Sequence, residues 1–175
     1  MIGFPLGLLY SNVGEWLIHK YVLHGLGKNK RSFWSFHFHE HHRNARKNDF
    51  KDQDYERSLF GWHAQTKETL GVAMIAIGHL PLLPVFPFFT GAVVYSAVNY
   101  HRIHKRAHQD PAWAKTHLPW HYDHHMGANQ DANWGVTWPW FDHLLGTRER
   151  FLGTERAARA EALRRPTGAP LTPTT

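Results

Sequence analysis

Cysteine is absent from the 175-residue chain, and its absence excludes several kinds of site. Disulfide scaffolds, thiolate zinc sites, iron–sulfur clusters and cysteine nucleophiles all require thiols. The length is that of one domain, which leaves no room for a separate cofactor-binding domain. Haem, flavin and nicotinamide motifs are also missing. Any redox chemistry in this chain would therefore draw its electrons from a separate protein.

Charged side chains are missing from two long stretches. Residues 69–101 contain no Asp, Glu, Lys or Arg, and Glu15 is the only such residue in positions 1–19. The twenty Lys and Arg residues lie in two blocks, 20–67 and 102–165. An uncharged stretch of this length is long for a buried core helix and is typical of membrane segments.

Three prolines divide the longer uncharged stretch. Pro81, Pro84 and Pro87 interrupt a helix because proline lacks the backbone N–H and clashes with the preceding turn. The pattern predicts a hairpin whose two arms have roughly 12–17 residues and reach about 18–26 Å as helices. Residues 2–18 predict a further apolar helix of about 26 Å, just short of a typical hydrocarbon core.

We therefore expect an all-α fold. Its integral membrane helices, an N-terminal helix plus the Pro-broken hairpin, would be capped by a helical domain on the cytoplasmic side, where the positive-inside rule places both basic blocks. One membrane-embedded domain over residues 1–153 would be followed by a helical extension and a disordered tail over 154–175. The alternative is a soluble helical protein with an unusually apolar buried hairpin. The net charge of +6 also suits nucleic acid, but charge clustered beside apolar helices favours a lipid bilayer, so we expect no nucleic-acid partner.

Histidine is strongly over-represented, with sixteen copies. Most of them gather in four clusters: EWLIHKYVLH at 15–24, FHFHEHH at 36–42, YHRIHKRAH at 100–108 and HLPWHYDHH at 117–125. Imidazole is a neutral nitrogen ligand suited to iron, copper, nickel and zinc. Within a helix, spacings of three and four residues place cluster members on one face. The clusters predict a site for two metals, whereas His63, His79 and His143 stand apart and are expected to be ordinary surface histidines.

The order and spacing of the clusters resemble a known superfamily. HKYVLH, HFHEHH, HKRAH and HYDHH follow the HxxxxH, HxxxHH, HxxxH and HxxHH boxes of the fatty acid hydroxylase and sterol desaturase superfamily. The segment NWGVTWPWFDHLLGT at 133–147 is similar to the segment after that family's last box. Glu15 and Trp16 resemble its acidic-aromatic lead into the first box. The resemblance runs from about residue 15 to residue 147.

The resemblance implies a membrane non-haem di-iron oxygenase that hydroxylates or desaturates a lipid C–H bond, fatty acyl or sterol-like, with O2 as co-substrate. It implies two iron ions, for which zinc can substitute on purification, and a separate ferredoxin-type or cytochrome-type electron donor. No catalytic residue is expected beyond the metal ligands. The implied ligands are His19, His24, His37, His41, His42, His104, His108, His121, His124 and His125, with His39 and His101 as possible additional ones.

Two departures from the family pattern leave questions open. Family members usually have four membrane crossings in two hairpins, whereas this chain offers one helix and one hairpin. In the second box His39 is an extra histidine, and we favour His37 because in a regular helix it shares a face with His41. A carotenoid-type hydroxylase and a non-catalytic membrane metal-binding protein remain alternatives. Four carboxylates near the boxes are predicted to orient imidazoles by accepting their free N–H; they are Glu15, Glu40, Asp123 and Asp142.

Overall fold

The structure is a computed structural model that describes residues 2–164. Over that range the chain forms eight α-helices joined by short 3-10 and π-helical segments, with no β-strand, so the all-α prediction is confirmed. The elements in chain order are α1 (Gly3–Leu17), η1 (Ile18–Leu26), η2 (His37–His41), α2 (His42–Lys47), η3 (Gln53–Glu56), α3 (Ala64–His79), η4 (Leu80–Leu82), α4 (Pro87–Gln109), α5 (Pro111–His117), α6 (Pro119–Met126), α7 (Trp140–Leu144) and α8 (Glu155–Arg164).

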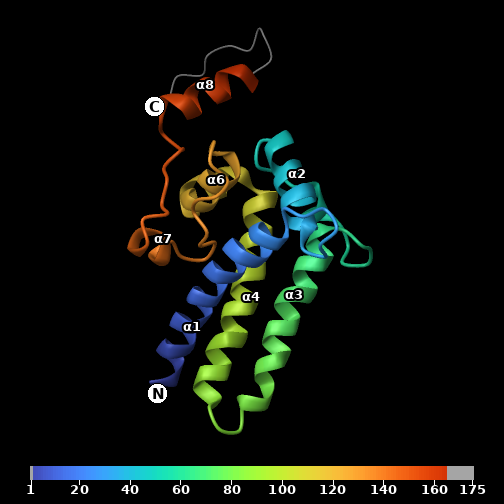
Figure 1. Ribbon diagram of the computed structural model, residues 1–175, viewed down its shortest axis with the longest axis vertical. Helices are drawn as coiled ribbons and strands as arrows, with labels where there is room; N and C mark the ends of the chain where they lie inside the picture. Colours follow the sequence, from blue (N-terminus) through green and yellow to red (C-terminus); the bar gives the residue numbers. More distant parts are fainter. Residues whose placement is uncertain (1, 165–175) are drawn as a thin grey trace.

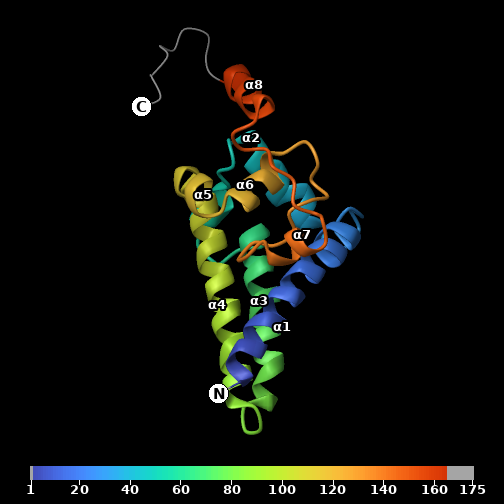
Figure 2. The same ribbon diagram turned by 90° about the vertical axis from the view of Figure 1, so that its left-hand side faces the viewer.

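Three long helices, α1, α3 and α4, form a stalk, and the other elements, apart from η4 in the hairpin turn at the far end, gather at one end of it as a cap (Figure 1). Helix α4 packs against both other stalk helices, whereas α1 and α3 make much less contact with each other. Gly7 permits the close approach of α1 to α4, because a Cβ there would lie 2.7 Å from both Ala92 Cβ and the carbonyl oxygen of Phe89. The quarter turn in Figure 2 shows the same division into stalk and cap.

The prolines break the uncharged stretch where the sequence predicts. Helix α3 ends at His79, a 3-10 turn covers Leu80–Leu82, and α4 begins with Pro87 in its first turn. Proline fits that position because a backbone N–H in the first turn would have no partner inside the helix, so its absence costs nothing. The predicted hairpin is therefore confirmed.

At the cap end of two stalk helices, helical structure continues beyond the apolar segment of the sequence. Helix α4 has 23 residues and carries the third histidine cluster from the stalk into the cap, so the predicted arm length was too short for it. Helix α1 ends at Leu17 as expected, but the chain continues without a break into the π-helix η1. Both extensions contain histidines and charged residues. A hydropathy pattern marks such residues as the end of an apolar helix, although their helix propensity is adequate.

No helix within residues 2–164 has the length and apolar character that crossing a bilayer requires. The stalk surface is nevertheless rich in exposed apolar side chains, among them Leu9, Met74, Ile77, Val85 and Phe88. Helix α8 lies in the segment expected to be a helical extension. Residues 165–175, which include the expected disordered tail, lie outside the described residues.

Candidate metal centre

Nine of the ten implied ligands form two buried groups where the stalk meets the cap. Within each group the nearest side-chain nitrogens lie within 4.8 Å of one another. The five-histidine group contains His19, His24, His37, His42 and His124. The four-histidine group contains His41, His104, His108 and His125. The cap elements η1, η2, α2 and α6 and the cap end of α4 supply them, so all four sequence clusters meet here.

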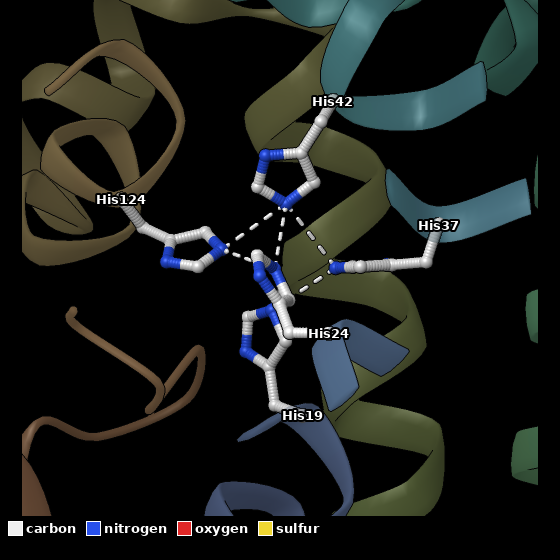
Figure 3. A group of neighbouring side chains, drawn as sticks. All are labelled: His19, His24, His37, His42 and His124. Atoms are coloured by element: carbon white, nitrogen blue, oxygen red, sulfur yellow. Dashed lines mark hydrogen bonds between the residues drawn. The ribbon is translucent and has the colours of Figure 1, made fainter. Parts of the chain in front are cut away.

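The π-helical segments explain how the first two clusters serve one group. His19 and His24 are five residues apart in η1, and His37 and His42 are five apart across the η2–α2 junction. In an α-helix, positions five apart point about 140° away from each other. A π-helix closes its hydrogen bonds between residues i and i+5, so such pairs return to one side. Figure 3 shows the two pairs and His124 pointing toward a common centre.

The expected regular helix around the second cluster is therefore wrong. His37 joins His42 in the five-histidine group, while His41 belongs to the other group. The rings of His37 and His41 still lie side by side, with centroids 5.2 Å apart, although the two residues belong to different groups. His37 is buried inside its group, whereas the Nε2 atom of His39 bonds the carbonyl oxygen of Lys28 at 2.9 Å.

The nitrogen spacings in the five-histidine group fit a metal ion. The Nε2 atom of His37 lies 3.0 Å from that of His19 and 3.3 Å from that of His42. The Nε2 atom of His124 lies 3.2 Å from that of His24 and 3.1 Å from that of His42. Nitrogens bound at about 2.0–2.1 Å around one ion would be separated by roughly 3.0–3.4 Å. A neutral imidazole has one N–H and one lone pair, and a cation would be attracted by the converging lone pairs.

Buried nitrogens without a hydrogen-bond partner indicate that the four-histidine group also fits a metal ion. The Nε2 atoms of His41 and His104 and both ring nitrogens of His125 are buried without a hydrogen-bond partner. The ring centroid of His41 lies 4.4 Å from that of His108 and 4.7 Å from that of His125. A buried polar atom without a partner costs about 1–3 kcal/mol. Coordination to a cation would remove that cost for one nitrogen of each ring, so this all-nitrogen set also fits a metal.

Backbone carbonyl groups orient two rings of the five-histidine group. The Nδ1 atom of His19 lies 2.6 Å from the carbonyl oxygen of Trp134, and that of His124 lies 2.6 Å from the carbonyl oxygen of Ala132. Both carbonyls flank Asn133, whose φ of 60° is rare for a residue other than glycine. An Nδ1–H donated to these oxygens leaves the Nε2 lone pair facing the centre.

Two carboxylates and a carbonyl group orient the four-histidine group. The Nδ1 atom of His41 lies 2.8 Å from Asp52 Oδ2, and that of His104 lies 2.9 Å from Glu68 Oε1. The Nδ1 atom of His108 lies 2.8 Å from the carbonyl oxygen of Phe50. Burial raises the pKa of both carboxyl groups, but their contacts with these imidazoles outweigh it and hold each pKa below its usual value.

The four carboxylates predicted to orient the rings form none of the described imidazole hydrogen bonds. Glu15 accepts hydrogen bonds from the backbone N–H groups of Val136 and Thr137, and Asp142 accepts from those of Trp134 and Gly135. Both therefore hold the loop that supports the five-histidine group. Glu40 pairs with Lys67, and Asp123 pairs with Arg148. Asp52 and Glu68 were missed because they lie between the clusters in sequence, where no spacing rule marks them.

The remaining histidines lie outside both groups. His121 is fully buried, and its Nε2 atom lies 3.1 Å from that of His108, so it borders the four-histidine group. The half-buried His101 contacts the hydroxyl of Thr69 at 3.4 Å. Neither His63 nor His79 belongs to a group, and each ring bonds a nearby backbone carbonyl, that of Ser58 or Ile75.

Burial keeps the histidines of the five-histidine group, together with His108 and His125, in the neutral form that binds metals. It lowers the pKa of His19 to about 4, and neighbouring imidazoles add to the effect at other positions. Desolvation is also the largest cause of a lowered pKa at His24, His37, His42, His108, His121, His124 and His125. At neutral pH these rings keep an unprotonated nitrogen.

An apolar cavity of about 420 Å³ lies within the stalk and reaches His19 of the five-histidine group. Residues of α1, α3 and α4 line it, and His19 and Glu68 form part of its wall at the cap end. Gly14 borders the cavity and faces open space, since a Cβ at this position would meet no neighbouring group within 4 Å. Because α1 and α3 make little contact, the cavity lies in the gap between them.

Comparison of the chain with models of protein families, with curated proteins and with solved structures found no match. The described structure itself shows an all-α chain with two buried histidine groups that could hold metal ions. The likeness to the hydroxylase and desaturase superfamily rests on the order of the boxes.

Proposed function

We propose that the chain is a membrane-bound non-haem di-iron oxygenase that hydroxylates or desaturates a fatty acyl or sterol-like lipid with O2. The observation that carries this proposal is the position of His19, a member of one of the two buried histidine groups, in the wall of an apolar cavity that also reaches Glu68 beside His104. A purely structural metal site needs no such cavity, and a closed coordination shell would serve it better. A chain that must bring an apolar molecule to a metal needs both buried metal ligands and an apolar cavity beside them.

The metal ligands in this proposal are the nine grouped histidines together with His121. When bound, two iron ions would supply the redox chemistry for O2 activation and C–H cleavage. The donor set does not select iron by itself, because imidazole also suits zinc, copper and nickel.

The protein's own residues would bind and place the substrate. Leu23, Trp34, Phe36 and Val93 give the cavity apolar walls, which favour an aliphatic chain over water. His19 lies in the cavity wall and in the five-histidine group, so a bound chain would lie beside that group. The surrounding side chains would fix which carbon lies nearest.

Exposed apolar side chains on the stalk support membrane embedding. Exposed apolar side chains gathered on one part of a protein mark sites that contact lipid or protein. Exposed Trp138 and Trp140 border α7, and exposed Phe60 and Trp62 precede α3. Figures 1 and 2 place both segments near the junction of stalk and cap, the level at which aromatic residues favour a membrane interface. We infer that the stalk enters the bilayer and that the cap, with the metal centre, lies on the cytoplasmic side.

The proposed reaction requires electrons from a separate ferredoxin-type or cytochrome-type protein. A surface cavity of about 330 Å³ is lined by His42, Arg43, Arg46 and Lys47. It places exposed cations beside a histidine of the five-histidine group. Such a surface would attract an acidic donor and bring it close to the metal centre.

Lipid analysis under oxygen would test the proposal. Cells with the protein should accumulate a hydroxylated or newly unsaturated lipid that is missing from cells without it and from cells with His124→Ala. A hydroxylated carotenoid as the product would favour the carotenoid-type alternative. If the metal-loaded protein changes no lipid in these cells, the oxygenase proposal is wrong and a non-catalytic metal-binding role is favoured.

A further inference from the structure

The two histidine groups differ in the charge that supports them. Asp52 and Glu68 are buried and lie within hydrogen-bond distance of His41 and His104 in the four-histidine group. In the five-histidine group, the ring contacts of His19 and His124 are with uncharged carbonyl oxygens. The carboxylate nearest that group is Asp131, 3.6 Å from His24 Nδ1. It is half exposed and pairs with Lys28 at 2.7 Å, so its charge is largely neutralised.

One short segment supplies most of this support. Over residues 50–55, Phe50 contributes the carbonyl group beside His108, and Asp52 contributes the carboxylate beside His41. The hydroxyl of Tyr55 donates to Glu68 at 2.6 Å, and Glu68 contacts His104. Asp52 is itself fixed by the backbone N–H of Asp54. The segment therefore holds three of the four ligands in the four-histidine group.

A buried carboxylate beside a ligating imidazole strengthens metal binding in two ways. It fixes the ring and its tautomer, and it makes the coordinating nitrogen more basic. Its negative charge also offsets the charge of a divalent ion where little water is present to do so. Removing a supporting group of this kind typically costs about 10- to 100-fold in metal affinity.

We propose that the two metal positions are unequal, and that the four-histidine group binds its ion more tightly because Asp52 and Glu68 act as positioning residues for its ligands. This inference rests on the proposed di-metal centre and concerns metal retention, not turnover. The five-histidine group has more ligands, but within residues 2–164 none of its rings has a hydrogen bond to a buried carboxylate; the buried Asp142 acts on it only through the backbone of Trp134. We therefore expect it to release its ion first and to fill last.

Zinc retention by the purified full-length protein tests the inequality. The protein is loaded with Zn²⁺ and dialysed against increasing EDTA, and retained zinc per chain is measured by elemental analysis. Two release steps are expected, separated by about 10-fold or more in EDTA. His124→Ala should lack the early step, and His108→Ala should lack the late step. Release of both ions in one step, or the opposite assignment of the steps, would overturn the proposal.

Variants that remove the carboxylate charge test whether that charge causes the tighter metal binding. Asp52→Asn and Glu68→Gln keep an oxygen that can accept the imidazole N–H but remove the negative charge. Each should move the late step to EDTA concentrations about 10- to 100-fold lower. Tyr55→Phe, which removes only the hydroxyl that holds Glu68, should move it less. Glu40→Gln is the matched control, because Glu40 pairs with Lys67, and its two steps should be unchanged.

The outcomes separate this inference from the proposed function. An unmoved late step in both carboxylate variants, with native-like circular dichroism, would overturn the inference. A protein that oxidises lipid but releases both zinc ions together would also contradict it and leave the oxygenase proposal standing. A protein that releases zinc in two steps yet changes no lipid would contradict only the oxygenase proposal.

Discussion

The carbonyl oxygen of Phe50 lies 2.8 Å from Nδ1 of His108, and it does so through a backbone conformation that phenylalanine rarely adopts. Phe50 has a φ of 76°, and Asp49 before it has a φ of 51°. Within residues 2–164 the other residue of this kind, apart from glycine, is Asn133, between the carbonyls that support His19 and His124. Each histidine group thus has a loop of unfavourable backbone conformation beside it. Such conformations persist where the surrounding structure fixes them, and they concentrate at functional sites.

Substitutions at Asn133 should separate its backbone role from its side-chain role. Asn133→Gly loses the bonds to Arg148 and Glu149 but tolerates the positive φ. Asn133→Val loses the same bonds and disfavours that φ, at an added cost of about 1–3 kcal/mol. Zinc retention and thermal unfolding would measure both effects. The valine variant should lose zinc from the five-histidine group, and the glycine variant should keep it. Equal zinc loss in both would show that the backbone conformation is unimportant.

A large side chain at Gly14 should block the apolar cavity. Gly14→Phe would project into it, whereas Gly91→Phe is the matched control on α4, since Gly91 also has open space around it but does not line the cavity. We expect Gly14→Phe to lower lipid oxidation by on the order of 10- to 100-fold without changing metal content. Equal activity of the two variants would mean that the substrate binds elsewhere.

His37→Ala and His39→Ala should behave differently. His37 is buried in the five-histidine group, and its removal should cost one metal per chain together with oxygen-dependent turnover. His39 contacts a backbone carbonyl near the surface, so its removal should cost at most about 1.5 kcal/mol of stability and leave both metals. Metal analysis and turnover of the two variants would decide. An inactive His39→Ala beside an active His37→Ala would reverse the assignment.

The sequence allowed prediction of the fold class, the proline-broken hairpin and the histidines that meet. Apolar periodicity and proline chemistry are local, so α1, α3 and α4 could be placed without coordinates. The division of the ligands could not be predicted, because it depends on the π-helical turn that puts His37 and His42, five residues apart, in one group and His41 in the other. Asp52 and Glu68 were also beyond prediction. Their contacts with His41 and His104 are made by the tertiary fold, and no local spacing indicates them.

The cysteine-free chain makes the proposed membrane arrangement easy to test. Single cysteines at Lys47 and Lys115, both in the cap, should react with an impermeant maleimide from the cytoplasmic side. A cysteine at Val85, near the tip of the hairpin, is 69% exposed in the structure and should be shielded by lipid. Labelling of positions 47 and 115 from opposite sides would contradict a single cap. Full reactivity at position 85 in membranes would contradict insertion of the stalk.

The metal-to-protein ratio tests the central claim, a two-metal centre built from nine grouped histidines and His121, most directly. Elemental analysis of active, purified protein should give two metal ions per chain. His124→Ala and His108→Ala should each reduce the ratio to about one, since each removes a ligand from a different group. His63→Ala, outside both groups, should leave it at two. A ratio of one or zero in fully active protein would contradict the account.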